Sequence, residues 1–459
     1  MALMQTLVGL QILLLFHVLG TTAQPIGVCY GTVADNLPPP KEVVDLYEAN
    51  GIEKMRIYNP DPSIMEALKG SNIELVVGVP NEDIQTLATS EPSAIQWVQN
   101  NIQTHTNYVK FRYIVVGNEI MPNDQQAQFM FRAMQNIYAA LVSFKLHTKI
   151  KVSTAIKLSL LGSSYPPSQG SFSPSSYSYI KPIISFLAVK DAPLLVNLYT
   201  YFTYIGDPND INLDFALFSP SNTTIKDGKY EYHNLFDASL DAVYAALEKL
   251  DAPNLQVVVS ESGWPSDGGS AATVLNAKLY YQNLVQHVTQ GTPKRPNQAL
   301  ETYLFAMFDE DLKGPAETER HFGLFHPNKN PKYEISFTSC SSESDVPNSS
   351  ALSMKNNVEL SHITDSVIHN FSIYSIAISH HYPKSSSFRL LQKRPHSSVI
   401  VVAKYIAAYL FTAHVAIAAY VVTVVVEFVA TFLLPIPFSL DSSLSCHCYE
   451  PQRCRYSYI

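Results

Sequence analysis

Short β-rich runs alternate with longer amphipathic segments from Gln24 to about Phe337. Val, Ile, Tyr and Phe, which fit the pleated surface of a strand, recur in eight of these runs. The runs cover residues 26–31, 54–59, 73–80, 111–119, 150–157, 193–202, 255–264 and 301–310. This alternation is typical of βα units arranged around a parallel sheet.

The segments between the runs carry helix signals. Asp61-Pro62 opens a segment that Gly70 closes, and Asn123-Asp124 precedes the apolar-rich segment 129–144. In 234–251 the apolar side chains fall on one helical stripe, so one face of this segment is expected to be buried. The pattern therefore predicts a helix after each strand.

Eight consecutive strand–helix units in roughly 310 residues match the size and order of a (β/α)₈ barrel. A doubly wound sheet rarely needs so many consecutive units, and no glycine-rich phosphate loop follows the first run, which excludes a dinucleotide-binding fold. We therefore predict the α/β class and a single (β/α)₈ TIM barrel over residues 24–338, followed by a C-terminal tail outside the barrel.

Residues 1–23 are typical of a secretory signal peptide. An apolar stretch from Leu7 to Leu19 is followed by the small residues Thr21 and Ala23, as a cleavage site requires. A buried N-terminal helix is the alternative. If the chain is secreted, the sequons at Asn222, Asn348 and Asn370 become glycosylation acceptors.

The composition changes beyond the barrel. Residues 339–397 are polar and Ser-rich, which predicts a disordered linker, and 398–438 are strongly apolar. Within that stretch 405–426 contains no Lys, Arg, Asp or Glu and is long enough to cross a membrane. Residues 439–459 form a short polar tail. Two interpretations stay open for the apolar segment, a transmembrane helix and a non-native extension of the chain.

The charge and the cysteine content of the chain argue against a nucleic-acid partner and against a metal site. The chain has 31 Lys+Arg against 39 Asp+Glu, a net charge of −8 without long runs of one sign, so we expect no nucleic-acid partner. Cys29 is followed by no cysteine until Cys340, so neither a disulfide framework nor a zinc spacing spans the barrel. Cys446-His447-Cys448 and Cys454 fit no common zinc module, and we predict no metal site.

Two glutamates lie at predicted strand ends, where (β/α)₈ barrels have their active sites. Glu119 closes the fourth run and Glu261 lies near the end of the seventh, and the carboxyl ends of barrel strands meet in one mouth. One carboxyl with a raised pKa and one ionised carboxylate are what glycoside hydrolysis requires. The alternative is a pair of strand-end salt bridges.

Further polar and aromatic residues gather at the strand ends. Glu310 closes the eighth run, and Lys313 and Glu319 follow it. Because strand eight adjoins strand seven in a closed barrel, these side chains can reach Glu261, or else they form a plain ion-pair network. Rings and amides together offer the apolar face and polar edge that a sugar needs. The candidates for substrate binding are Tyr30, Asn59, Asn118, Tyr199, Phe202, Trp264 and Phe308.

Several motifs occur together and in a fixed order: IGVCYG, RIYNPD, VVGNE, VNLYTYF, VSESGWPSDGG, FAMFDEDLK and ERHFGLFHP. In this order they resemble the plant glucan endo-1,3-β-glucosidases of glycoside hydrolase family 17, over about residues 25–337. The resemblance implies a retaining endo-hydrolase on a (β/α)₈ barrel without cofactor or metal. It makes Glu119 the acid/base and Glu261 the nucleophile, with Glu310, Lys313 and Glu319 as supporting residues.

The resemblance also carries expectations about substrate and location. The substrate is 1,3-β-glucan, from callose or fungal walls in cell-wall remodelling and plant defence, and mixed-linkage 1,3;1,4-β-glucan is the alternative. We expect a monomer secreted to the cell wall, with the vacuole as a second destination, and membrane attachment only if 405–426 spans a bilayer. A non-catalytic wall-glucan-binding protein or a membrane-tethered surface protein on the same barrel is the alternative function.

Overall fold

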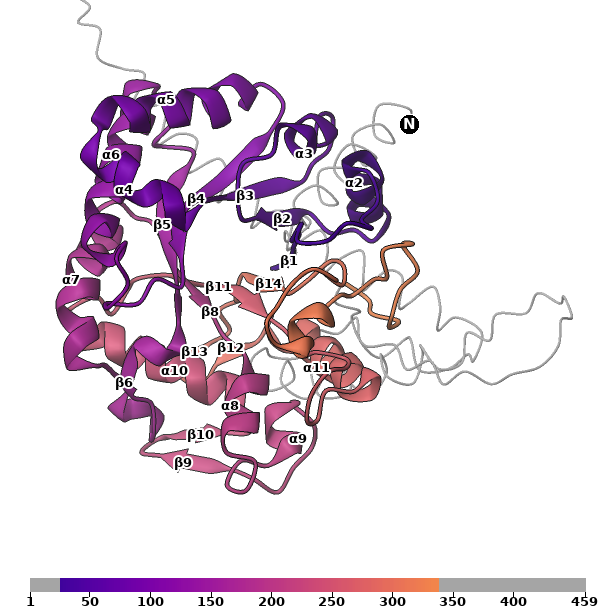
Figure 1. The fold of residues 1–459 in the computed structure, drawn as a ribbon. Helices are drawn as coiled ribbons and strands as arrows, with labels where there is room; N and C mark the ends of the chain where they lie inside the picture. Colours follow the sequence, from indigo (N-terminus) through magenta and orange to yellow (C-terminus); the bar gives the residue numbers. More distant parts are fainter. Residues whose placement is uncertain (1–24, 338–459) are drawn as a thin grey trace, which may run out of the picture. The chain divides into compact units, whose positions relative to one another are not determined.

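The computed structural model describes residues 25–337. Eight parallel strands close into a barrel in the order β1-β2-β3-β4-β5-β8-β11-β14, and helices surround them (Figure 1). The fold is therefore the predicted (β/α)₈ barrel. The barrel strands are β1 (Ile26–Cys29), β2 (Lys54–Ile57), β3 (Glu74–Val79), β4 (Lys110–Asn118), β5 (Lys151–Lys157), β8 (Leu194–Asn197), β11 (Val257–Ser262) and β14 (Thr302–Leu304).

Helices connect the strands on the outside of the barrel (Figure 1). They are α2 (Pro40–Ala49), α3 (Pro62–Ala67), α4 (Ile84–Thr89), α5 (Glu91–Asn101), α6 (Ala127–Ser143), α7 (Pro174–Val189), α8 (Thr200–Gly206), α9 (Leu213–Ala216), α10 (Leu235–Glu248) and α11 (Val274–His287). The 3₁₀ turns are η1 (Asn81–Asp83), η2 (Gln103–His105), η3 (Leu158–Leu160), η4 (Pro167–Gln169) and η5 (Glu317–Arg320). Within the described residues the last barrel strand is followed by η5 and irregular chain, where a full helix was expected.

Small two-stranded antiparallel sheets lie in the segments that connect the barrel strands and helices. They are β6 (Leu161–Ser163) with β7 (Ser171–Phe172), β9 (Ile225–Asp227) with β10 (Tyr230–Tyr232), and β12 (Gly291–Thr292) with β13 (Arg295–Pro296). The first two pairs lie in the long connections after β5 and β8, so those connections are more elaborate than the plain strand–helix pattern predicted.

Some predicted runs extend past the end of their strands. The sixth run was 193–202, but β8 ends at Asn197 and helix α8 begins at Thr200. The eighth run was 301–310, but β14 ends at Leu304. Most side chains in these extensions are apolar or aromatic, so composition alone does not mark the strand end. Where the strands end, the chain leaves the barrel to build the walls of the mouth.

The strands bury both of their faces. In β3, Leu75 and Val77 face the layer between strands and helices, whereas Val76 points into the barrel interior with Val115 and Leu195. A strand covered on both faces reads as a continuous apolar run, which is why the eight runs are visible in the sequence.

The predicted helix starts have a local cause. Asp61 caps α3, since its carboxylate accepts hydrogen bonds from the backbone N–H groups of Ser63 and Ile64 at 2.8 and 3.2 Å. Asn234 caps α10 by accepting from the N–H of Asp237 at 2.7 Å. These caps confirm the helices predicted after Asp61-Pro62 and within 234–251.

The predicted segments at the two ends of the chain lie outside the described residues: 1–23, 339–397, 398–438 and 439–459, together with the sequons at Asn348 and Asn370. Among the helices of residues 25–337, none combines the length and apolar character needed to cross a membrane. Tyr333 and Phe337, at the end of the described chain, are buried in the core.

Candidate active site

A pocket of about 690 Å³ opens where the carboxyl ends of the barrel strands meet. Both predicted glutamates, Glu119 and Glu261, line it. The other predicted site residues in its wall are Tyr30, Asn59, Asn118, Tyr199, Phe202, Glu310, Lys313 and Glu319. The barrel thus brings together residues that are far apart in the sequence.

Glu119 is presented by a bend at the end of β4. Gly117 has φ +70° and Glu119 has φ +56°, so the backbone enters the left-handed region on both sides of Asn118. Asn81 clamps this bend, because its side chain accepts from the N–H of Asn118 at 2.8 Å and donates to its carbonyl at 3.1 Å. The Gly-Asn-Glu sequence is therefore what turns the Glu119 carboxyl into the pocket.

The surroundings of Glu119 suit a general acid. Asn197 donates to Oε1 at 3.0 Å, and the ammonium of Lys157 lies 3.6 Å from Oε2. Burial and the nearby charge of Glu261 raise the pKa of Glu119, while the Asn197 hydrogen bond and the Lys157 charge oppose that rise. A carboxyl that keeps its proton longer can deliver it to a leaving group.

Glu261 has the opposite surroundings. It is 6% exposed, and the guanidinium of Arg56 lies 3.0 Å from its Oε1. The phenol of Tyr58 donates to Oε1 at 2.8 Å and that of Tyr199 to Oε2 at 2.7 Å. One cation and two hydroxyl donors contact this carboxylate and fix its direction, as a nucleophile requires.

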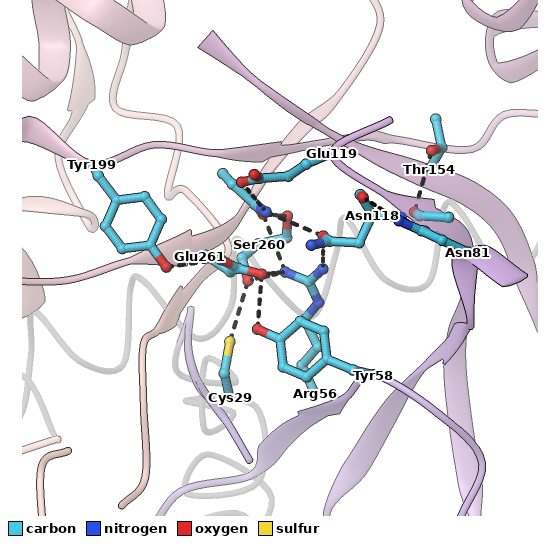
Figure 2. A network of polar contacts seen from close by, with 12 residues as sticks. Cys29, Arg56, Tyr58, Asn81, Asn118, Glu119, Thr154, Tyr199, Ser260 and Glu261 are labelled. Atoms are coloured by element: carbon cyan, nitrogen blue, oxygen red, sulfur yellow. Dashed lines mark hydrogen bonds and ion pairs between the residues drawn. The ribbon is translucent and has the colours of Figure 1, made fainter. Parts of the chain in front are cut away.

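Arg56 connects the parts of the site. Its guanidinium donates to Glu261 Oε1, to the Ser260 carbonyl at 2.7 Å, to Asn197 Oδ1 at 3.1 Å and to Asn118 Oδ1 at 2.8 Å (Figure 2). Only 1% of the residue is exposed. Because buried charges are stable only when paired and hydrogen-bonded, this network fixes both glutamate-bearing strands relative to each other.

The sequence did not predict Arg56 or Lys157 as site residues. A usable signal existed for Arg56. Met55 and Ile57 are apolar and alternate with it in β2, so strand periodicity places Arg56 on the interior face beside Tyr58. For Lys157, the only signal in the sequence was its position at the end of the fifth run.

The predicted supporting residues form an ion-pair network. Lys313 lies 3.6 Å from Glu310 and 3.5 Å from Glu319, and its ammonium sits 4.0 Å from the centre of the Phe305 ring. Glu310 is buried and accepts from the N–H of Val33 at 3.0 Å. This network lines the pocket. A Cβ at Gly31 would overlap the Glu310 carboxylate, so any larger residue there would force that carboxylate to move.

Two predicted substrate-binding residues pack elsewhere, and for them the prediction is wrong. Trp264 is fully buried, with its ring 5.1 Å from that of Tyr201 and its Nε1 donating to the Ala271 carbonyl at 2.9 Å. Phe308 is 2% exposed and packs edge-on against Tyr30 at 6.2 Å. Neither lines the pocket. Both rings follow the strand ends, where the chain has already turned back into the core.

Phe202 keeps its predicted place. It is 40% exposed and lines the pocket beside the ring of Tyr199, at 5.3 Å between centroids. An exposed ring in a pocket wall offers an apolar platform.

Within residues 25–337 no three His, Cys, Asp or Glu side chains are arranged to hold a metal ion.

Known proteins are similar to this chain in sequence and in fold. A glucan endo-1,3-beta-glucosidase of Vitis vinifera is 56% identical over 319 residues, which cover 69% of this chain and 92% of that protein. One of Pisum sativum is 51% identical and covers 72% and 90%. The structure of CJP38, a beta-1,3-glucanase and allergen of Cryptomeria japonica pollen, is 44% identical with a TM-score of 0.66, over 68% of this chain and 99% of that one.

The match to a family extends over the whole described barrel. Residues 26–337 match the family described as Glycosyl hydrolases family 17. This range includes both pocket glutamates and the strands that carry them. The chain therefore belongs to glycosyl hydrolase family 17.

Proposed function

We propose that the protein is an endo-hydrolase of 1,3-β-D-glucosidic linkages in 1,3-β-glucans such as callose and fungal wall glucan, acting with retention of anomeric configuration. The observation that carries the proposal is the pair of glutamates in one pocket with opposite surroundings. The relatives named glucan endo-1,3-beta-glucosidase, of which the chain covers about nine tenths, support the bond and the substrate class.

The two carboxyl groups divide the chemistry. In the first step Glu261 attacks the anomeric carbon, and Glu119 gives its proton to the glycosidic oxygen as that bond breaks. In the second step Glu119 takes a proton from water, the water oxygen attacks the same carbon, and Glu261 is released. Arg56, Tyr58 and Tyr199 contact both oxygens of Glu261 and hold its carboxylate in a fixed direction for this attack.

The pocket wall supports binding of a neutral sugar. The exposed ring of Phe202 offers a stacking surface, and Asn59 and Asn118 offer polar edges. The charged pairs in the wall are already matched within the protein, as in Lys313 with Glu310 and Glu319. Uncharged glucan is therefore a better fit than an acidic polysaccharide.

The first experiment compares substrates. We expect reducing sugars to be released from laminarin as mixed oligosaccharides, with β-configured products by ¹H NMR at early times, and more slowly from mixed-linkage barley glucan. Release of glucose alone from chain ends would contradict endo action. Binding of laminarin without any release would favour the non-catalytic wall-glucan-binding protein.

A second experiment tests the two roles. Glu261→Ala and Glu119→Ala should each lower kcat by several orders of magnitude, and only in Glu261→Ala should azide restore an inverted product, because the anion replaces the missing nucleophile. In Glu119→Ala with an activated aryl glycoside, azide should give a retained product. The reverse pattern would exchange the two assignments.

Secretion to the cell wall is part of the proposal. It is supported by the signal-like residues 1–23 and by the exposed Asn222 sequon, which a glycosylating enzyme can reach. Expression of the full chain in plant cells, with N-terminal sequencing of the recovered protein, should give a start near Gln24. Retention of residues 1–23 in an intracellular product would contradict it.

A further inference from the structure

Lys157 is the last residue of β5, and its ammonium faces the pocket. Nζ lies 3.6 Å from Oε2 of Glu119, and the lysine side chain is 40% exposed. The other oxygen of that carboxyl, Oε1, accepts a hydrogen bond from Asn197 Nδ2 at 3.0 Å.

The two contacts decide where the catalytic proton sits. Oε1 is committed as an acceptor, so the protonated form of Glu119 carries its hydrogen on Oε2. Lys157 therefore faces the oxygen that releases and takes up the proton. A cation at this place favours the form of Glu119 that has lost its proton.

Other charges around Glu119 are already engaged. Glu261 on β11 and Arg56 on β2 also act on it, but they pair with each other at 3.0 Å. In the same pocket wall Glu310, Lys313 and Glu319 form their own network. Lys157 is thus the cation whose ion pair is made with Glu119 itself.

We propose that Lys157 is a positioning residue for Glu119. The lysine charge eases proton release from Glu119 to the leaving sugar and opposes proton uptake from water. It therefore shifts the alkaline limit of activity to a lower pH. The inference rests on the proposed role of Glu119 as acid/base. It extends that role, because a partly exposed lysine, and not only the buried network around Arg56, affects the pKa of Glu119.

The test is the pH profile of kcat/KM on laminarin for the wild type, Lys157→Met and Lys157→Arg. The alkaline limb should move upward by about 0.5–1 pH unit in Lys157→Met, and Lys157→Arg should keep the wild-type limb. Added salt screens an exposed pair, so 1 M NaCl should move the wild-type limb toward that of Lys157→Met and leave the variant unchanged.

The matched control is Lys151→Met. Lys151 is the first residue of the same strand, at the opposite end of the barrel, where its Nζ lies 3.3 Å from Asp191. Its profile should coincide with that of the wild type. Equal shifts in Lys151→Met and Lys157→Met would overturn the inference, because net charge alone would then explain the effect.

A second measurement needs no turnover. The Glu119 carboxyl can be titrated by ¹³C NMR in protein labelled at glutamate, with Glu119→Gln identifying the signal. Its midpoint should rise in Lys157→Met, and an unchanged midpoint would overturn the inference. A wild type that releases no sugar while the midpoint still moves would instead overturn the proposed function and leave the Lys157 contact supported.

Discussion

At the residue scale, identical side chains acquire different chemistry from their neighbours. Glu119 has one amide donor and a partly exposed lysine, whereas Glu261 is enclosed by a guanidinium and two phenols. Burial of Glu119 raises its pKa, and the Arg56 charge stabilises the Glu261 carboxylate. The proposed division of labour therefore rests on the contacts and not on the residue type.

Arg56→Met tests how far Glu261, the proposed nucleophile, depends on its buried partner. We expect kcat to fall by about 100-fold or more with a smaller change in KM, since the carboxylate loses its cation and its fixed direction. The variant should also unfold more easily at neutral pH, by about 3–5 kcal/mol, because an unpaired buried carboxylate remains. Denaturant unfolding at pH 7 and at pH 4 measures this cost.

Arg132→Met is the control for that variant, since Arg132 is exposed on α6. It should keep both activity and stability. A fully active Arg56→Met protein would show that Tyr58 and Tyr199 suffice to orient Glu261.

At the element scale, close backbone packing fixes the connections between strands. Gly170, between η4 and β7, faces the backbone carbonyl of Ala242 in α10, and a Cβ at this position would overlap that oxygen. The connection after β5 is thus packed tightly against a helix that follows β8. Glycine is needed here for its small size rather than for an unusual φ.

Gly170→Ala should therefore destabilise the barrel by about 1–3 kcal/mol, because backbone has to move against backbone. Gly206→Ala is the matched control, since a Cβ at Gly206 would meet nothing within 4 Å. That control should change stability by less than about 0.5 kcal/mol. Thermal unfolding of both variants measures the difference, and equal melting temperatures would refute the packing argument.

Helix α10 also carries a buried acid. Asp241 is fully buried, and it accepts a hydrogen bond from the N–H of Lys294 at 2.9 Å. Burial raises the pKa of Asp241 from 3.8 to about 6. The folded state therefore binds its proton more tightly than the unfolded state, and the resulting stabilisation is present below about pH 4 and is lost as pH rises through about 6.

Asp241→Asn removes this titration and keeps a side-chain oxygen for Lys294. The stability of the wild type relative to the variant should fall between pH 4 and pH 7, by up to about 3 kcal/mol. Urea unfolding of both proteins at several pH values measures the difference. A difference that stays constant over this range would contradict the shifted pKa.

At the scale of the whole molecule, the barrel closes within the described residues. Strands β1 and β14 pair in parallel, with Ile26 opposite Thr302, so the two ends of the domain meet. At the amino ends of the strands, Arg112 joins Glu74 at 3.0 Å and Glu301 at 2.5 Å. Ionic contacts thus link β3, β4 and the chain entering β14 at the end of the barrel opposite the pocket.

A chain that ends at Ser339 should fold and hydrolyse 1,3-β-glucan as well as the full chain. The reason is that Tyr333 and Phe337 already complete the core. Circular dichroism and laminarin hydrolysis of both chains, with and without detergent, make the comparison. An unfolded or inactive short chain would show that residues beyond 339 contribute to the catalytic domain.

The sequence alone determined the barrel and the two glutamates. Strands buried on both faces appear as apolar runs, and carboxyl groups at their ends stand out against those runs, so Glu119 and Glu261 could be found by their position. The caps of α3 and α10 were also visible, because capping depends on neighbours in the chain.

The tertiary structure decided which residues touch the glutamates. Arg56 reaches Glu261 across the barrel from β2, and Lys157 reaches Glu119 from the neighbouring strand β5. Both contacts join segments that are distant in the sequence, so no local pattern encodes them. Trp264 and Phe308 look like pocket rings in sequence but are buried, because the direction of a side chain after a strand end depends on how the chain turns. Position along a strand is a local property, whereas the contacts that tune a carboxyl group arise only when the barrel closes.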